Sequence, residues 1–280
     1  MSAKSPRDEL SLQEAADLLG VHYMTAYRYV RTGRLAARQS EGKWRVRRSS
    51  LDRMPQPERA GRSKRGATTN YRHYVRGLTE RLVQGDEAEA WRLLQQGLTS
   101  AFTPEELYLE VLVPALRRVG DQWAAGHLTI AQEHRASAVM SRLIGWLGPS
   151  LLRRGVKRGH VVLGAPSDDH HGLPTALVAD VLRGRGYSVT DLGAHTPFLS
   201  FVETIGASDQ LVGTGVVVSA PLRDQAIAAT ITAIKAVSEA PLLLGGVTIR
   251  DERHARRLGA DAWTNSTRAA ADWFDATARS

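Results

Sequence analysis

The sequence predicts a multidomain protein: a winged helix-turn-helix domain, a four-helix bundle and an α/β domain with a parallel sheet. Three observations predict this arrangement. The excess positive charge lies in the first quarter of the chain, the middle shows only helical periodicity, and short apolar runs alternate with helical ones from residue 160 onward. The expected parts are a helix-turn-helix domain at 1–54, a basic linker at 55–69, the bundle at 70–152 and the α/β domain at 153–280.

Composition limits the class of protein. The chain has 280 residues, 42% of them hydrophobic, which is enough for several small cores. It contains no cysteine, which excludes disulfides and thiolate metal ligands and favours a cytoplasmic location. No signal peptide is evident, and no apolar run approaches the roughly 20 residues of a membrane span, so we expect no membrane partner.

The distribution of charge predicts a polyanionic partner for the N-terminal segment alone. The whole chain has a formal net charge of +8, and residues 1–68 carry 15 Lys/Arg against 7 Asp/Glu. The remaining residues are therefore balanced in charge. From Pro55 to Thr69 the chain is rich in Pro, Gly and basic residues without apolar periodicity, which is typical of a flexible linker.

Two short helices separated by a glycine are predicted in the N-terminal segment. The first is expected over Leu12–Leu19, where Ser11 and Glu14 form a capping box and Gly20 ends the helix. The second, at about His22–Arg31, takes the place of a recognition helix that enters the DNA major groove. Five of its side chains can contact bases or phosphates: His22, Tyr23, Thr25, Tyr27 and Arg28.

A β-hairpin is predicted next, with two short runs on either side of Glu41-Gly42 within residues 35–46. Basic side chains decorate it in the manner of a wing that contacts the phosphate backbone: Arg38, Lys43, Arg45, Arg47 and Arg48. Trp44 is expected to fill the core beneath the wing rather than to stack on a base.

Residues 10–53 resemble the winged helix-turn-helix of MerR-type and excisionase-type DNA-binding proteins. The resemblance is carried by the segments Leu12–Val21 and Gly42–Val46. It implies double-stranded operator DNA as the partner, and the charge distribution supports the same conclusion independently.

Residues 70–152 carry four helical stretches, at roughly 70–84, 86–100, 103–125 and 129–151. The third and fourth open with capping boxes at Thr103 and Thr129. Their apolar stripes are Leu109, Leu112, Leu116, Val119 and Trp123, and Ala136, Met140, Leu143 and Leu147. Three residues before the second stripe stands Glu133. Because an unpaired buried carboxylate is costly, Glu133 lies either in water at the open end of the bundle or against a polar ligand.

Trp123, nine further residues and then Glu133-His134 form a spacing that resembles the signature of cobalamin-binding, light-responsive transcription regulators of the CarH/LitR type. The resemblance implies that the bundle caps the upper face of a corrin ring. Trp123 would then pack over the upper axial group, and Glu133 and His134 would bond to that group or shape its pocket.

The C-terminal domain is predicted to be a flavodoxin-like, doubly wound α/β fold. Strands are expected at 160–164, 187–192, 214–219, 241–245 and 262–264, and helices at about 174–186, 197–207, 223–238, 249–258 and 267–278. Such alternation indicates a parallel sheet, and ligands in these folds bind beyond the carboxyl ends of the strands. Glycines at two strand ends, Gly193 and Gly245-Gly246, would let a bulky ligand approach the backbone.

The loop Ala165–Pro174, after the first of these strands, carries two carboxylates and two imidazoles between Asp168 and His171. A metal-ligating histidine commonly gives its second ring N–H to a carboxylate, so this density suits a metal site. Taken alone, the loop is equally compatible with a solvated polar surface.

The same region resembles the B12-binding domain shared by methionine synthase, corrinoid methyl carriers and CarH-type regulators, whose motifs read E/D-x-H-x-x-G, S-x-L and G-G. Asp169-His170-His171 matches the first motif. The resemblance implies His171 as the lower axial ligand of cobalt, with Asp169 orienting it. Ser219 would contact the buried nucleotide tail, and Gly245-Gly246 match the third motif.

Some residues depart from these motifs. Pro174 stands where the family has glycine, although proline is well tolerated at a helix start, and the second motif reads Ser219-Ala-Pro-Leu222. Moving the first motif one residue earlier, onto Asp168 and His170, would place a leucine at the glycine position, so we prefer His171.

A further departure follows the signature tryptophan, where light-sensing members of the family usually have a histidine that captures cobalt after photolysis. Here that position is Ala124. A light-exposed state would therefore bind water or another histidine, His127 or His134, or would release cobalamin.

The order of domains implies, by resemblance, a transcription repressor whose operator binding and homo-oligomerisation, as a dimer or tetramer, depend on adenosylcobalamin and on light. No nucleophile or acid–base dyad indicates an enzyme. Two alternatives stay open: a regulator of the same build that senses another ligand or works without cobalamin, and a corrinoid-binding methyl carrier or enzyme component.

Overall fold

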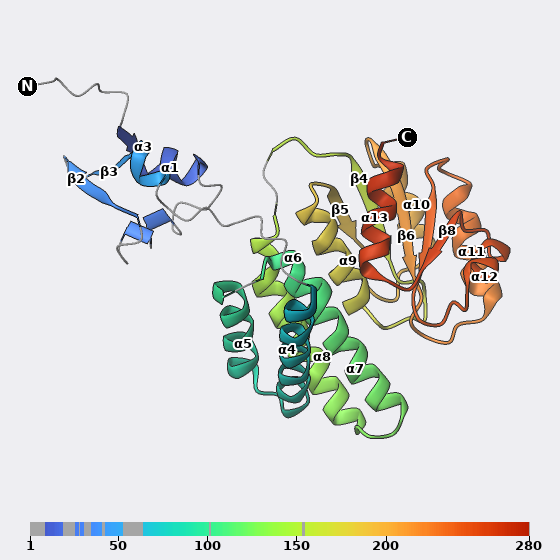
Figure 1. The fold of residues 1–280 in the computed structure, drawn as a ribbon. Helices are drawn as coiled ribbons and strands as arrows, with labels where there is room; N and C mark the ends of the chain where they lie inside the picture. Colours follow the sequence, from blue (N-terminus) through green and yellow to red (C-terminus); the bar gives the residue numbers. More distant parts are fainter. Residues whose placement is uncertain are drawn as a thin grey trace, which may run out of the picture. The chain divides into compact units, whose positions relative to one another are not determined.

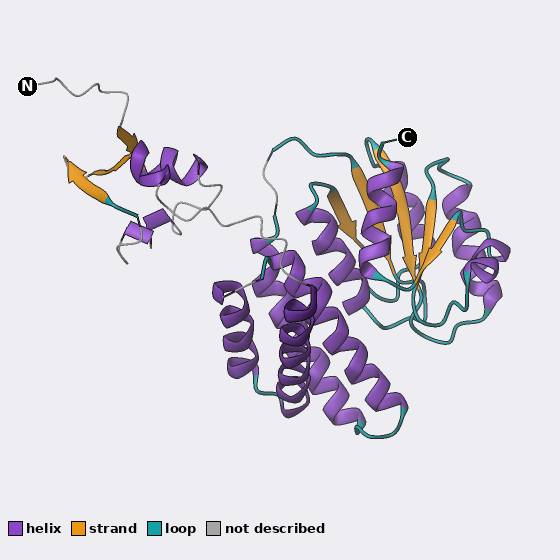
Figure 2. Cartoon of the chain, in the orientation of Figure 1, coloured by secondary structure: helices purple, strands orange, loops and turns teal. Residues whose placement is uncertain are grey.

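The computed structural model describes residues 9–18, 26–27, 29–30, 35–40, 43–52, 64–100, 102–152 and 155–279. The chain divides into two compact units, Met1–Lys64 and Arg65–Ser280. Figure 1 traces the chain, and Figure 2 shows helices and strands in the first unit and helices flanking a sheet in the second. The second unit contains both the bundle and the α/β domain, so their predicted boundary near residue 153 stays a prediction.

The N-terminal unit is built on a three-stranded antiparallel sheet. Its elements are β1 (Glu9–Ser11), α1 (Leu12–Leu18), β2 (Ala37–Ser40), β3 (Lys43–Arg47) and α3 (Arg48–Asp52). The strand order is β1-β3-β2, and the predicted hairpin is confirmed because β2 and β3 pair on either side of residues 41–42. The strand β1 was not predicted, since three residues without apolar alternation carry no strand signal.

The apolar side of α1 packs into the core of this unit, where Leu12 and Ala16 are buried with Val46. The predicted capping box is present, because the backbone N–H of Ser11 donates to Glu14 and that of Glu14 donates to the Ser11 hydroxyl. Within the predicted second helix, Ala26, Tyr27, Tyr29 and Val30 are helical. Of the side chains expected to contact DNA, those of His22, Tyr23, Thr25, Arg28 and Lys43 lie outside the described residues.

The helices of the bundle are α4 (Lys64–Gln84), α5 (Glu87–Ser100), α6 (Pro104–Leu107), the π-helical turn η2 (Tyr108–Leu112), α7 (Val113–Ala124), α8 (Ile130–Leu147) and a 3₁₀ turn, η3 (Gly148–Ser150). The predicted third helix is thus interrupted by the π-helical turn. Both predicted capping boxes are present, at Thr103 and Thr129. The residues of the two stripes are buried, apart from Leu116, which is half-buried, and Trp123, which is 48% exposed, so the first stripe leaves the core at the end of α7.

The α/β domain has a five-stranded parallel sheet in the order β5-β4-β6-β7-β8, which confirms the flavodoxin-like prediction. The strands are β4 (His160–Gly164), β5 (Ser188–Asp191), β6 (Leu211–Val217), β7 (Leu242–Gly245) and β8 (Ala262–Thr264). The helices are α9 (Leu173–Gly184), α10 (Phe198–Gly206), α11 (Asp224–Lys235), α12 (Glu252–Arg257) and α13 (Thr267–Thr277). Of the strands, β6 departs most from prediction, since it begins three residues early and ends two residues early.

Two apolar cores cover the two faces of this sheet. One core runs without a break from the bundle through α9 and α13 and includes Leu143, Leu182 and Phe274. The other packs α10 and α11 against the sheet and includes Phe201 and Ile231. Figure 1 shows α9 beside the bundle, and the core that the bundle shares with α9 and α13 holds it against the α/β domain.

Tyr108, in the π-helical turn, joins the bundle to α9 through a buried hydroxyl. Its oxygen lies 2.7 Å from Asp180 Oδ2 and 3.2 Å from the carbonyl oxygen of Ile144. Burial, together with the Asp180 carboxylate, raises the pKa of Tyr108 far above its usual range, so the hydroxyl keeps its proton.

We expect Tyr108→Phe to lower the free energy of unfolding by about 1–3 kcal/mol, because Asp180 loses a hydrogen-bond partner away from water. Urea denaturation of both proteins measures this difference. Tyr71→Phe is the matched control, since its hydroxyl lies 3.2 Å from Glu106 in a half-buried position, and it should cost less than about 1 kcal/mol. Equal losses of stability in both variants would argue against a special role for Tyr108.

Candidate functional site

The loop between β4 and α9 is organised around a buried carboxylate. Asp169 is 0% exposed, and its Oδ2 accepts hydrogen bonds from the backbone N–H groups of Ser219 (2.6 Å) and Ala220 (3.0 Å). Its Oδ1 accepts from the backbone N–H of His171 (3.1 Å) and from Nδ1 of the same residue (2.7 Å). Four donors therefore satisfy the buried charge. Because Ser219 and Ala220 turn toward Asp169, β6 ends at Val217 and not at residue 219 as predicted.

This carboxylate fixes the orientation of the His171 ring. Since Nδ1–H donates to Asp169, the lone pair of a neutral ring lies on Nε2. The His171 side chain is 55% exposed, which leaves Nε2 accessible. His170 instead stacks on His195, with 4.8 Å between ring centroids. The geometry supports the choice of His171 over His170 as the ligand.

A cavity of about 880 Å³ lies between the bundle and the carboxyl ends of the strands. Its lining includes Trp123, Glu133, His134, His171, Ser219, Gly245 and Gly246. These residues come from α7, α8 and three loops of the α/β domain, and every one was predicted to bind a cofactor. Asp169, the remaining predicted residue, lies behind His171 and does not line the cavity.

The bundle wall of the cavity carries an oriented carboxylate. Glu133 Oε1 accepts a hydrogen bond from Ser137 Oγ at 2.6 Å, and Oε2 lies 2.6 Å from His134 Nδ1. Glu133 thus faces the cavity and is anchored on its own helix. Trp123 lines the same wall, and its exposed area leaves an apolar surface open at the cavity.

The opposite wall is formed by closely packed backbone where β6 and β7 end. Gly246 has a φ of +113°, and a Cβ at this position would lie 2.0 Å from the carbonyl oxygen of Val218, so only glycine fits. At Gly245 a Cβ would lie 3.3 Å from the carbonyl oxygen of Thr264. This contact is tight, and β8 would have to shift slightly to accommodate it. Both glycines let a ligand meet the main chain directly.

The residues that depart from the family motifs also line the cavity. Pro174 lies in the first turn of α9, where proline is tolerated, as predicted. Ala124 is the last residue of α7, and its methyl group offers no metal ligand. Of the two histidines considered in its place, His134 lines the cavity and His127 does not.

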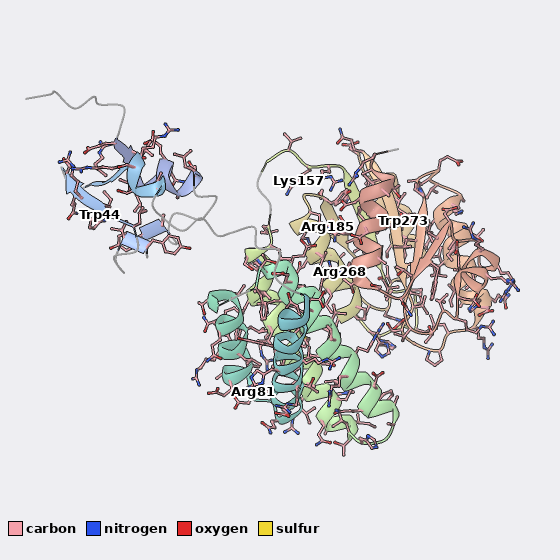
Figure 3. All side chains as sticks on the ribbon, in the orientation of Figure 1. Trp44, Arg81, Lys157, Arg185, Arg268 and Trp273 are labelled. Atoms are coloured by element: carbon pink, nitrogen blue, oxygen red, sulfur yellow. The ribbon has the colours of Figure 1, made fainter. Side chains whose placement is uncertain are left out.

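Polar contacts between distant segments fasten the bundle to the α/β domain. Arg117 lines the cavity and donates to the carbonyl oxygen of Asn265 at 3.0 Å, and Arg268 donates to Glu110 at 2.7 Å. Arg185 reaches Glu105 at 3.1 Å, and Figure 3 shows Arg185 and Arg268 where the bundle meets the α/β domain. Sequence reasoning missed these pairs, because their members lie 80 to 158 positions apart.

The wing carries basic side chains in the N-terminal unit. Arg47 on β3 is exposed and Arg45 is half-buried. Arg38 on β2 makes a two-pronged ion pair with Glu9, at 3.0 Å and 2.8 Å, a partner that sequence reasoning did not anticipate. This hydrogen-bonded guanidinium lowers the pKa of Glu9. Arg38 is therefore engaged within the unit, whereas Arg47 is an exposed cation on β3.

Two aromatic residues of this unit, Tyr27 and Trp44, are half-buried and pack against its core. The position of Trp44, which Figure 3 labels, agrees with the predicted core role. Tyr27 was predicted to contact DNA, and its ring lies partly within this apolar cluster, so only a fraction of it is available to a partner.

The donor set at the cavity fits a metal that brings most of its own ligands. Among the residues that the structure describes, no three histidine, aspartate or glutamate side chains gather into a metal site. The His171 imidazole, with a buried carboxylate behind it, suits a metal held in a macrocycle, which needs few ligands from the protein. The glycine-lined wall and the cavity volume suit a bulky, flat ligand.

Comparison with known families identifies the parts of the chain. Residues 74–147 match the model of a B12 binding domain, and residues 9–54 match that of a helix-turn-helix domain. The fold and the site thus define a B12-binding module joined to a helix-turn-helix domain. The chain has the build of a cobalamin-binding, DNA-binding regulator. None of the described helices is both long and apolar enough to cross a membrane.

The individual relatives include proteins named as corrinoid proteins and one named as a transcriptional repressor. The chain is 26% identical over 191 residues to trimethylamine corrinoid protein 1 of Methanosarcina acetivorans, covering 65% of this chain and 86% of that protein. It is 33% identical over 138 residues to the HTH-type transcriptional repressor CarH of Myxococcus xanthus, covering 48% and 45%. The solved structure of the Methanosarcina barkeri monomethylamine corrinoid protein shares the fold, with a TM-score of 0.59, 19% identity, and coverage of 72% of this chain and 97% of that one.

Proposed function

We propose that this protein is a cytoplasmic transcription repressor whose binding to operator DNA is controlled by adenosylcobalamin and by light. The observation that carries the proposal is the Asp169–His171 pair at a cavity lined by both the bundle and the α/β domain. The helix-turn-helix domain supports DNA binding, and the similarity to a protein named as a transcriptional repressor supports the direction of control.

The protein's own residues divide the work of holding the cofactor. His171 Nε2 would bind the cobalt, and Asp169 would keep the ring in the tautomer that leaves Nε2 free to bind. Trp123, Glu133 and His134 would hold the cofactor from the bundle, and Ser219, Gly245 and Gly246 would hold it from the α/β domain. A bound adenosylcobalamin supplies a cobalt–carbon bond that light can break.

Control of DNA binding would then follow from linkage. A ligand that touches both the bundle and the α/β domain stabilises one arrangement of the two, and this arrangement would favour a homo-oligomer competent to bind DNA. After illumination, Trp123 and Glu133 would lose contacts with the cofactor. Ala124 carries no metal ligand. Of His127 and His134, His134 lines the cavity and could bind cobalt instead, and without such a bond the cofactor would be held less tightly or released.

The test is to purify the protein with adenosylcobalamin in the dark and to select a binding site from random DNA duplexes. We expect a cobalamin absorption spectrum, DNA retardation in the dark and its reversal by green light. A colourless protein whose His171→Ala variant behaves like wild type would refute the cofactor and leave a regulator of another ligand. Retardation that persists unchanged under light would refute light sensing alone.

A corrinoid methyl carrier is the second candidate. It is favoured by the similarity of the bundle and α/β domain to proteins named as corrinoid proteins. The helix-turn-helix domain counts against it, since methyl transfer does not require a DNA-binding unit. A carrier would bind cobalamin without any cofactor-dependent change in DNA affinity, so the retardation experiment separates the two functions.

Removing basic side chains from the wing should weaken DNA binding without changing sequence preference. For Arg45→Ala and Arg47→Ala we expect weaker binding to all duplexes and a salt slope reduced by about one for each phosphate that the wing no longer neutralises. Fluorescence anisotropy across a series of salt concentrations measures both. Arg256→Ala is the control, because Arg256 is paired with Glu252 in the α/β domain. An unchanged slope in the wing variants would mean that another face contacts DNA.

A further inference from the structure

We propose that His195 is a positioning residue for the cobalt ligand, acting through the loop that carries Asp169 and His171. The inference rests on the proposed function, since it concerns how well His171 is presented to a metal. His195 lies in the connection between β5 and α10, apart from the cobalamin motifs, and it makes contacts to three successive residues of the β4–α9 loop.

The side chain and the backbone of His195 each make a hydrogen bond to the main chain at Asp168 and Asp169. Its Nδ1 accepts a hydrogen bond from the backbone N–H of Asp168 at 2.8 Å. Its own backbone N–H donates to the carbonyl oxygen of Asp169 at 2.7 Å. Its ring stacks on that of His170, at an interplanar angle of 21°. These contacts fix the main chain from which the Asp169 carboxylate projects.

Asp168 and His195, the two residues joined by the hydrogen bond to Nδ1, both have a left-handed backbone conformation. Their φ angles are +69° and +51°. This conformation is unfavourable for residues with a Cβ and persists only where the surroundings hold it. Here backbone contacts join the β4–α9 loop to the connection between β5 and α10. The Thr196 N–H donates to the carbonyl oxygen of Ala165 at 2.8 Å, and Thr196 pairs with Pro166 in a parallel bridge. The hydrogen bond from the Asp168 N–H to His195 Nδ1 extends these contacts to Asp168.

A chain of hydrogen bonds therefore leads from His195 to the ligand atom. Because Nδ1 of His195 accepts, a neutral ring carries its proton on Nε2, the opposite tautomer to His171. Without that acceptor, the Asp168 N–H loses its partner in a strained turn. The Asp169 carboxylate would then be less well held, and so would the Nδ1–H of His171 that donates to it.

Three variants separate the hydrogen bond from the backbone strain. His195→Asn keeps a side-chain acceptor and tolerates left-handed φ, whereas His195→Gly relieves the strain but has no acceptor. His195→Ala lacks the acceptor and keeps the strain. Gln210→Ala is the matched control, because Gln210 also has a left-handed φ, +53°, but lies between α10 and β6 and outside the cavity lining.

The full-length protein, labelled with ¹⁵N-histidine and loaded with cob(II)alamin, reports axial ligation by electron paramagnetic resonance through coupling to the imidazole nitrogen. We expect full coupling in wild type, His195→Asn and Gln210→Ala. For His195→Gly and His195→Ala we expect about fivefold weaker cobalamin binding and a fraction of cobalt without imidazole coupling. Nitrogen NMR of the cofactor-free protein should show a weakened Nδ1–H bond of His171 in the same two variants.

Wild-type affinity and coupling in both His195→Gly and His195→Ala would overturn the positioning role. So would equal reductions of affinity in His195→Ala and Gln210→Ala, since these would trace to backbone strain alone. Failure of the proposed function looks different: wild type itself would lack imidazole coupling, or His171→Ala would retain it.

Discussion

Asp169→Ala is expected to lower the free energy of unfolding by about 3 kcal/mol. The carboxylate is 0% exposed, and its removal would leave the N–H groups of Ser219 and Ala220 without their acceptor in the interior. His171 would lose the partner of its Nδ1–H at the same time, so cobalamin affinity should fall by about 10–100-fold. Urea denaturation of the cofactor-free protein and a spectroscopic titration with cobalamin measure the two effects.

His171→Ala separates stability from ligation. The side chain of His171 is 55% exposed, and Asp169 keeps its three backbone N–H donors without it, so truncation should lower the free energy of unfolding by only about 1 kcal/mol. Coupling of cobalt to a histidine nitrogen should nevertheless disappear, because the neighbouring His170 ring is stacked on His195. If His171→Ala were as destabilising as Asp169→Ala, the pair would be a structural element of the loop and not a ligand with its support.

Gly246→Ala is expected to cost about 3 kcal/mol or more in the free energy of unfolding. A Cβ would lie 2.0 Å from the carbonyl oxygen of Val218, and the φ of +113° is unfavourable for any residue with a side chain. Because Gly246 lines the cavity, the displaced backbone should also abolish cobalamin binding. Thermal denaturation and the same titration test both expectations.

Gly193→Ala is the matched control for Gly246→Ala. Gly193 has a φ of +74°, but a Cβ there would meet nothing within 4 Å, so only the backbone conformation is penalised, by about 1 kcal/mol. Similar losses of stability in the two alanine variants would show that the predicted clash at Val218 relaxes without cost, and that the tight approach of the two strands is unimportant.

Much of the fold could be predicted because the signals are local. The capping boxes at Ser11, Thr103 and Thr129 predicted where helices of the N-terminal unit and the bundle begin. The alternation of apolar runs after residue 160, also a property of neighbouring residues, predicted the helices and strands of the α/β domain. Elements without such signals were missed. The short strand β1 forms through pairing with β3, and the π-helical turn at Tyr108–Leu112 has no periodic signature.

The candidate site could be predicted in composition but not in geometry. The spacing of Trp123, Glu133 and His171 suggested, by resemblance, that distant segments meet at one ligand, and all three residues line one cavity. The hydrogen-bond donors to Asp169 were not foreseen, because two of them are backbone N–H groups, which every residue except proline carries. The ion pair between Glu9 and Arg38 was missed for a related reason, since charge alone does not say which partners meet.

The sequence by itself determined the order of domains, the parallel α/β architecture and the residue types available at the cavity, because these follow from periodicity, motif spacing and charge along the chain. The motif register favoured His171 over His170, but only the tertiary structure showed which imidazole meets a buried carboxylate: that of His171 lies on Asp169, and that of His170 on His195. The physical reason is that two adjacent histidines in a loop are chemically equivalent until the surrounding backbone fixes which ring nitrogen finds a buried acceptor.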